Sequence, residues 1–231
     1  ARIGRPDTGV ISYAEMRDQG MNICQAVSIP VIGDGDTGYG NPINVRRTVQ
    51  GYAQAGFAAI MIEDQVASKR CGHTQGKQIV GLSEAVTRIR AAVDARKEGA
   101  DILILARTDA CAVEGFDEAL WRIQAFEELG ADILFLEAPT TNDQMRAFCR
   151  SVKGPCMANL VEGGKTPILP PGELHDLGFR IAAYPLTLLN ASIRAMQQAL
   201  GALKTGTAVQ GLMPFEELQA VVGFGAYDAE Q

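Results

Sequence analysis

Short apolar runs alternate along this chain with amphipathic stretches that end at a glycine. Gly56, Gly99, Gly130 and Gly178 each precede such a run by one to three residues. Glycine is favoured at the left-handed position just past a helix end. Nearly continuous apolar runs are typical of parallel strands that are covered on both faces. The alternation therefore predicts repeated strand–helix units, which fold as a parallel α/β sheet.

The repeated units suggest a particular parallel fold. We count six, at 30–56, 58–99, 101–130, 132–154, 156–178 and 179–204. Polar residues recur at the strand ends, which favours a (β/α)8 barrel with its chemistry at one face over an open dinucleotide-binding sheet. Because six units are two short of eight, we expect two more to precede Ala1. We expect residues 1–231 to form one barrel domain with a C-terminal helical region at about 186–231.

Composition limits the possible partners. The chain has 231 residues and a net charge of −6, which argues against a nucleic acid or an anionic membrane as partner. No apolar run approaches the ~20 residues of a membrane span. The five cysteines are odd in number and show no CxxC spacing. They predict reduced thiols in a cytoplasmic or organellar protein.

Acidic residues recur where the expected strands end. They are Asp34 and Asp36, Glu63 and Asp64, Asp109, and Glu137. Any one of them could simply cap the next helix, but in a barrel the strand ends converge on one mouth. Two residues apart on a strand, Asp34 and Asp36 are expected to point the same way. Several carboxylates at one mouth predict a divalent cation, and oxygen donors favour Mg²⁺ or Mn²⁺ over zinc.

Residues 65–82 (QVASKRCGHTQGKQIVGL) form a long segment without helical or strand periodicity. Such a loop in a compact α/β chain is usually a functional lid or disordered. The segment carries a thiol among basic side chains: Cys71 with Lys69, Arg70, His73 and Lys77. Basic neighbours favour the thiolate and allow proton exchange near neutral pH. The alternative is a solvated basic loop with an incidental cysteine. A basic lid over a metal predicts a small anionic chelating substrate, such as a di- or tricarboxylate or a phosphonate.

Seven motifs together resemble the isocitrate lyase / phosphoenolpyruvate mutase superfamily, and most closely its methylisocitrate-lyase-like branch. They are DGDTGYG at 34–40, IEDQ at 62–65, KRCGH at 69–73, ARTDA at 106–110, EAP at 137–139, ANLVEGGKTP at 158–167 and YPLT at 184–187. The resemblance covers nearly the whole chain. It implies a (β/α)8 barrel, dependence on Mg²⁺, and a homotetramer built from dimers that swap a C-terminal helix.

The resemblance also implies roles for individual residues. Asp36 would be the direct metal ligand, and Asp34 would bind the metal or the α-keto acid end of the substrate. Water molecules on the metal would be held by Glu63, Glu137 and Asp7. Arg107 would clamp a substrate carboxylate, and the opposite wall and remaining substrate contacts would come from Asn159, Glu162, Thr166, Gly72 and Pro185. Cys71 would be the general acid, with Lys69, Arg70 and His73 beside it.

The implied activity is Mg²⁺-dependent cleavage of a C–C bond in a 2-hydroxy di- or tricarboxylate, such as a methylisocitrate or a dimethylmalate. Methylisocitrate lyases often carry His at the position of Met61 and an aromatic residue at that of Gly163, so the side group of the substrate stays open. Pro185 resembles the C–C lyase version. The alternatives are an oxaloacetate hydrolase or decarboxylase, a phosphonate enzyme, and a barrel that binds ligands without catalysis.

Overall fold

The computed structural model describes residues 2–67, 69 and 76–230 of the chain. It divides into two compact units, Ala1–Pro185 and Leu186–Gln231. The first unit contains the sheet, and the second consists of helices. A single domain spanning 1–231 stays a prediction.

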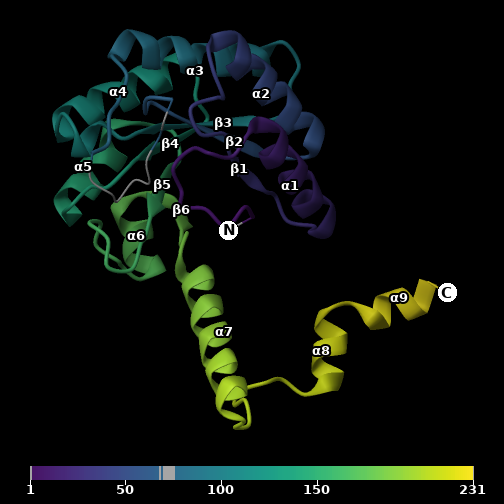
Figure 1. Cartoon of the computed structure of the whole chain (residues 1–231). Coiled ribbons are helices and arrows are strands. Elements are labelled where there is room, and N and C mark those ends of the chain that lie inside the picture. The colour runs from purple at the N-terminus through teal and green to yellow at the C-terminus, as the bar shows by residue number, and fades with distance from the viewer. Residues whose placement is uncertain (1, 68, 70–75, 231) are drawn as a thin grey trace. The chain divides into compact units, whose positions relative to one another are not determined.

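A parallel six-stranded sheet organises the first unit. Its strands are β1 (Ile32–Asp34), β2 (Ala59–Glu63), β3 (Leu103–Thr108), β4 (Ile133–Leu136), β5 (Cys156–Asn159) and β6 (Phe179–Ala183). Each strand pairs in parallel with the next one along the chain. The sheet curls, and within the described residues β1 and β6 form its two edges (Figure 1). The parallel α/β prediction is confirmed as part of a barrel, and the two units expected before Ala1 stay a prediction.

Helices connect the strands and cover the outer face of the sheet (Figure 1). They are α1 (Tyr13–Ala26), α2 (Pro42–Ala55), α3 (Leu82–Lys97), α4 (Phe116–Leu129), α5 (Asn142–Ser151) and α6 (Pro171–Leu177), and a short 3-10 helix, η1 (Ala110–Ala112), follows β3. The Asn41 side chain accepts hydrogen bonds from the N–H groups of Ile43 and Asn44 and so starts α2, as expected of an N-cap. Gly56 ends α2 at a φ of +95°, where glycine is favoured.

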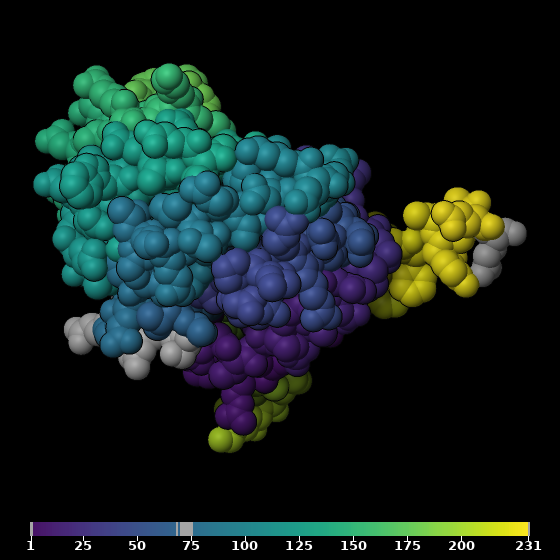
Figure 2. Space-filling view, turned by 90° about the horizontal axis from the view of Figure 1, so that it is seen from above, coloured from purple at the N-terminus to yellow at the C-terminus, as the bar shows by residue number. Residues whose placement is uncertain are grey.

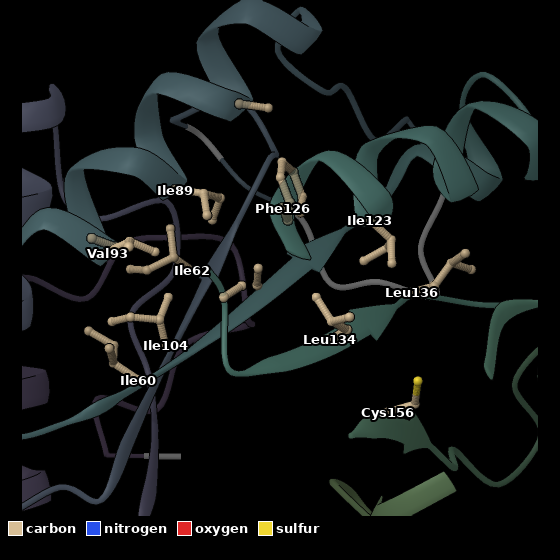
Figure 3. Close-up of a cluster of buried hydrophobic side chains, with 14 of the residues drawn as sticks. Ile60, Ile62, Ile89, Val93, Ile104, Ile123, Phe126, Leu134, Leu136 and Cys156 are labelled. Carbon is tan, nitrogen blue, oxygen red and sulfur yellow. The ribbon is translucent and has the colours of Figure 1, made fainter. Parts of the chain in front are cut away.

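Two apolar layers lie on opposite faces of the sheet. On the outer face, Ile60 and Ile62 of β2 and Ile104 of β3 pack against helix residues such as Ile89 (Figure 3). On the inner face, alternate residues form a smaller cluster: Ala59, Leu105, Ile133, Phe135 and Met157. Side chains alternate between the faces of a strand, and burying each large side chain contributes about 1.5–3 kcal/mol. The strand sequences are therefore almost continuously apolar, because both faces of the sheet are covered.

The ends of the 65–82 segment pair with each other. Gln65 and Ile79 form an antiparallel bridge, and the Val80 N–H donates to the Asp64 carbonyl oxygen at 2.9 Å. No strand periodicity was visible here, because two or three paired residues are too few to produce a pattern. The bridge places the described ends of this segment directly beyond β2.

The N-terminal residues lie against α2. Figure 2 shows the purple N-terminal segment packed beside the blue surface of the following helix. The Tyr13 ring stacks on Tyr52, with centroids 6.3 Å apart, and the Arg47 guanidinium lies 5.2 Å above the Tyr13 ring. The Tyr52 hydroxyl donates to the Asp34 carbonyl oxygen at 2.9 Å, so Tyr52 connects the start of α1 to the end of β1.

The second unit contains α7 (Thr187–Thr205), α8 (Phe215–Val221) and α9 (Phe224–Glu230). None of the described residues of α7 is buried, although the helix is amphipathic. Its exposed apolar side chains include Leu188, Met196, Leu200 and Leu203. Across the described part of the chain, no helix is long and apolar enough to cross a membrane.

Candidate active site

The acid pair at the end of β1 belongs to a tight turn. The strand ends at Asp34, whose Oδ1 accepts a hydrogen bond from the Asp36 N–H at 2.9 Å. Asp36 has a φ of +48°, outside the strand region. Gly35 lies against β2, and a Cβ there would come within 2.7 Å of the Met61 carbonyl oxygen. The expectation that Asp34 and Asp36 align through strand alternation is therefore wrong, because the turn brings their carboxylates together instead.

Lys69 places a cation among three aspartates. Its Nζ lies 2.7 Å from Asp36 Oδ1, 2.9 Å from Asp7 Oδ1 and 3.8 Å from Asp34 Oδ2. Burial opposes its charge, yet the nearby aspartates raise the pKa of Lys69 above its ordinary value. For Asp36, burial and then the charge of Asp34 raise the pKa, against the opposing charge of Lys69. Three of the predicted metal residues thus converge on one positive charge.

Glu63 ends β2 as a buried carboxyl group that is only 1% exposed. Neither of its oxygens has a hydrogen-bond partner among the described residues. Arg107 Nε lies 3.2 Å from Oε2, which is an ion-pair distance without hydrogen-bond geometry. Burial raises the pKa of Glu63 to about 8, although the charge of Arg107 opposes that rise. Its unsatisfied oxygens are available to a ligand or to water held by one.

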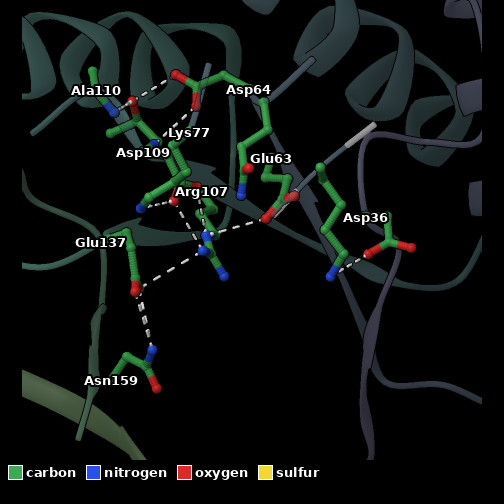
Figure 4. A network of polar contacts seen from close by, with 12 residues as sticks. Asp36, Glu63, Asp64, Lys77, Arg107, Asp109, Ala110, Glu137 and Asn159 are labelled. Atoms are coloured by element: carbon green, nitrogen blue, oxygen red, sulfur yellow. Dashed lines mark hydrogen bonds and ion pairs between the residues drawn. The ribbon is translucent and has the colours of Figure 1, made fainter. Parts of the chain in front are cut away.

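Arg107, from β3, lies at the centre of a polar network (Figure 4). Its Nε and Nη2 donate to the two oxygens of Asp109 at 2.8 and 3.0 Å. Nη2 also lies 3.9 Å from Oε2 of Glu137. The guanidinium carbon lies 5.0 Å from the centre of the Phe135 ring, which suits a cation–π contact. Arg107 therefore connects the acids at the ends of β2 and β4.

The predicted opposite wall is only partly assembled around this network. Asn159 Nδ2 donates to both oxygens of Glu137, at 3.2 and 3.4 Å (Figure 4). Thr166 is buried, and its Oγ1 has no hydrogen-bond partner within the described chain. Glu162 and Pro185 are exposed. The structure therefore brings Asn159 together with Glu137 and leaves the other predicted contacts as predictions.

A deeper layer of charged residues supports Arg107. The Asp109 N–H donates to Asp64 Oδ1 at 2.8 Å, and Thr108 Oγ1 donates to Asp64 Oδ2 at 2.6 Å. Arg122 Nη1 donates to the same Oδ2 at 3.2 Å. Lys77 Nζ donates to Asp109 Oδ1 at 2.6 Å. The sequence analysis placed Asp109 only among the acids at the strand ends and Lys77 only among the basic residues of the 65–82 segment, and it gave neither residue a role of its own. The two-residue spacing of Arg107 and Asp109 at a strand end was a signal that could have found the first of them.

Four predicted site residues lie outside the described residues. They are Arg70, Cys71, Gly72 and His73. Their roles stay predictions from the sequence. Lys69, which precedes them, is described and contacts the acid cluster.

The carboxylate cluster fits a hard divalent cation that is held largely through water. Nowhere in the described ranges do three or more His, Cys, Asp or Glu side chains gather closely enough to hold a metal by themselves. The aspartates nevertheless converge on the Lys69 ammonium, and Glu63 keeps unsatisfied buried oxygens. Mg²⁺ commonly binds through one or two carboxylates and keeps several waters. Asp36 and Asp34 would hold such an ion, with Glu63, Glu137 and Asp7 contacting its waters.

The fold and the site define an enzyme of the parallel α/β barrel type. Its site has an acid cluster around the Lys69 ammonium, beside the buried guanidinium of Arg107. Comparison with known proteins gives the family: the model described as phosphoenolpyruvate phosphomutase matches residues 1–204. The chain belongs to this family, within the isocitrate lyase / phosphoenolpyruvate mutase superfamily.

Two similar proteins specify the branch. The chain is 42% identical to 2,3-dimethylmalate lyase of Eubacterium barkeri, over 96% of this chain and 78% of that protein. It is 46% identical to 2-methylisocitrate lyase of Aeropyrum pernix, over 86% of this chain and 63% of that protein. These relatives place the chain in the methylisocitrate-lyase-like branch, among carbon–carbon lyases. The chain spans less than the full length of both.

Solved structures agree with the fold. A crystal structure of 2,3-dimethylmalate lyase matches with a TM-score of 0.93 and 39% identity, over 99% of this chain and 78% of that one. Oxaloacetate acetylhydrolase with the inhibitor 3,3-difluorooxalacetate also matches with a TM-score of 0.93, at 34% identity, over 98% of this chain and 78% of that one. The barrel architecture is therefore shared by lyases and by a hydrolase.

Proposed function

We propose that the chain is a Mg²⁺-dependent lyase that cleaves the C–C bond of a 2-hydroxy di- or tricarboxylate. The products would be an α-keto acid such as pyruvate and a dicarboxylate. The observation that carries this proposal is the convergence of Asp7, Asp34 and Asp36 on one cationic group, beside the Glu63–Arg107 pair. A site of this kind suits a substrate that offers both chelating oxygens and a separate carboxylate.

Different residues of the site would bind the two ends of the substrate, the chelating oxygens at one end and the separate carboxylate at the other. A bound Mg²⁺ supplies electrostatic stabilisation of negative charge on chelated oxygens. Arg107 binds a carboxylate of the substrate, because the bidentate contact with Asp109 holds its guanidinium in one orientation. Asn159 donates a hydrogen bond to Glu137 and so orients that carboxyl group beside Arg107. These groups are fixed before the substrate arrives, and such preorganisation stabilises the charge that develops during cleavage.

Cys71 completes the reaction as the general acid in this proposal. Loss of the hydroxyl proton to a base allows the C–C bonding electrons to leave with the departing fragment. That fragment becomes a carbanion stabilised by its carboxylate, and it takes the thiol proton of Cys71. The basic residues Lys69, Arg70 and His73 favour the thiolate that remains. These roles rest on the resemblance of the KRCGH motif at 69–73 to the lyase branch.

The assembly and location expected from the sequence are part of the same proposal. The exposed apolar side chains of α7 support a homotetramer of helix-swapped dimers, because such a surface is normally covered in the assembled protein. The described cysteines are free, which supports a reducing compartment such as the cytoplasm.

A panel of substrates tests the proposal. Methylisocitrate, dimethylmalate, isocitrate, oxaloacetate and phosphonopyruvate are assayed for release of pyruvate, glyoxylate, acetate and oxalate, with Mg²⁺ and with EDTA. We expect Mg²⁺-dependent release of a keto acid from a 2-hydroxy acid. If none of the 2-hydroxy acids yields a keto acid, the lyase proposal is wrong.

Two variants separate the proposed chemistry from binding. Cys71→Ser should lower turnover by about a hundredfold or more, the contribution of a well-placed general acid, while Mg²⁺ affinity stays unchanged. Cys24→Ser in α1 is the matched control and should keep full turnover. Oxaloacetate hydrolysis is the second candidate, because of the similarity to oxaloacetate acetylhydrolase. It predicts oxalate and acetate from oxaloacetate without cleavage of any 2-hydroxy acid.

A further inference from the structure

Asp109 holds the guanidinium of Arg107 from one side. The two oxygens of Asp109 accept from Nε at 2.8 Å and from Nη2 at 3.0 Å. This bidentate contact fixes the plane of the guanidinium as well as its position. The hydrogen bonds of Arg107 to other described residues use Nε and Nη2, and none of them uses the remaining nitrogen, Nη1. The edge left over is therefore the one that can receive a carboxylate.

Asp109 is itself held rigidly. Its side chain is fully buried, its N–H donates to Asp64, and its Oδ1 accepts a second cation, Lys77, at 2.6 Å. Burial by itself raises the pKa of Asp109, but the charges and hydrogen bonds of Arg107 and Lys77 outweigh burial and hold the pKa below its ordinary value. Asp109 thus favours its ionised form, and these contacts hold its carboxylate against Arg107.

The position of Asp109 also suggests helix capping, but the side chain does not act as a cap. Asp109 directly precedes η1, and its side chain makes no capping hydrogen bond with that helix. Its hydrogen bonds go to two buried cations instead. Its presence at the end of β3 is therefore explained by Arg107 and Lys77.

Without Asp109, Arg107 has other carboxylates within reach. Glu63 lies 3.2 Å from Nε and Glu137 lies 3.9 Å from Nη2. An arginine released from Asp109 would rotate toward these acids and donate hydrogen bonds to their carboxyl oxygens, because a buried guanidinium left without partners is costly. Its free edge would then no longer face an incoming carboxylate.

We propose that Asp109 is the positioning residue of Arg107, which it keeps off Glu63 and Glu137 so that one edge of the guanidinium stays available to the carboxylate of the substrate. This inference rests on the proposed function, in which Arg107 binds that carboxylate. Asp109 acts only through Arg107 and has no contact with the reacting carbon in this proposal.

A double-mutant cycle tests the dependence on Arg107. Asp109→Asn keeps the shape and removes the charge, and it should raise KM for the 2-hydroxy acid about tenfold or more, with a smaller change in kcat. In the Arg107→Lys background the same change should have no further effect on KM. Asp101→Asn, exposed before the other end of β3, is the matched control and should leave KM unchanged. Additive effects on KM would overturn the proposal, since they would show that Asp109 acts independently of Arg107.

Nuclear magnetic resonance of the full chain tests the geometry without any substrate. The Arg107 Nε–H resonance, identified by its absence in Arg107→Lys, should exchange slowly with solvent in the wild type and rapidly in Asp109→Asn. An unchanged exchange rate overturns the proposal. This readout stands even if no substrate is turned over, so failure of the proposed function is distinguished from failure of this inference. Should Asp109→Asn not fold, Asp109→Glu keeps the charge and displaces the guanidinium, and unchanged Nε–H exchange in that variant would likewise overturn it.

Discussion

Replacement of Glu63 by glutamine should change how the stability of the metal-free protein depends on pH. Glu63 is only 1% exposed, and its oxygens lack hydrogen-bond partners among the described residues. Burial raises its pKa to about 8, against an ordinary value of 4.5. Glutamine has nearly the same shape as the protonated acid and cannot ionise. The substitution therefore removes the titration and leaves the packing.

The direction of the effect follows from proton binding. Between pH 4.5 and pH 8, Glu63 has lost its proton in the unfolded chain and keeps it in the folded one. The folded state then binds more protons, so the free energy of unfolding falls as pH rises through this range. At about 1.36 kcal/mol per pKa unit, the whole range corresponds to at most roughly 5 kcal/mol. The part between about pH 6 and pH 8.5 corresponds to roughly 2–3 kcal/mol.

Urea unfolding followed by circular dichroism, with EDTA present, measures this difference. Wild type should lose roughly 2–3 kcal/mol more than Glu63→Gln between about pH 6 and pH 8.5. Glu128→Gln, on the exposed surface of α4, is the matched control and should follow the wild type. Parallel pH profiles for wild type and Glu63→Gln would show that Glu63 is already ionised near pH 6, and the burial argument would then be wrong.

Three further substitutions probe the packing and the charges of the site. Gly35→Ala places a Cβ 2.7 Å from a carbonyl oxygen of β2 and should lower the unfolding free energy by about 1–3 kcal/mol. Gly172→Ala, which has open space around it, is the control and should not lower it. Equal thermal stabilities of the two variants would contradict the contact. Lys69→Met removes the cation among three aspartates and should raise Mn²⁺ affinity about tenfold in titration calorimetry, so an unchanged affinity would count against a shared cation site. Arg122→Met leaves the buried Asp64 without its charged partner and should cost about 3–5 kcal/mol in urea unfolding; a cost near zero would show that the other hydrogen bonds of Asp64 suffice.

The order and type of the main elements could be predicted from the sequence. Apolar runs such as 102–106, which follow a helix-ending glycine, became buried strands within one or two residues of the expected bounds. The reason is local: glycine at the left-handed position ends a helix, and a strand covered on both faces must be apolar throughout. The acids at successive strand ends could be found in the same way, because parallel strands direct their ends to one edge.

The contacts within the site could not be predicted from the pattern. Asp34 and Asp36 meet because a left-handed turn at Asp36 redirects the chain, and strand alternation plays no part in it. Lys69 pairs with Asp36, 33 residues away in the sequence, and Lys77 pairs with Asp109, 32 residues away. Such long-range pairings depend on the path of the 65–82 segment back to the sheet, and the hydrophobic pattern of the sequence does not predict that path.

The sequence by itself determined the parallel α/β architecture, the edge of the sheet that carries the acids, and the family resemblance through its motifs. Only the tertiary structure decided which charges neighbour one another: Lys69 among the aspartates, and Asp109 between Arg107 and Lys77. The physical reason is that helix ends and strand burial are properties of neighbouring residues, whereas the pKa values and partners of buried charges depend on the distances that folding creates.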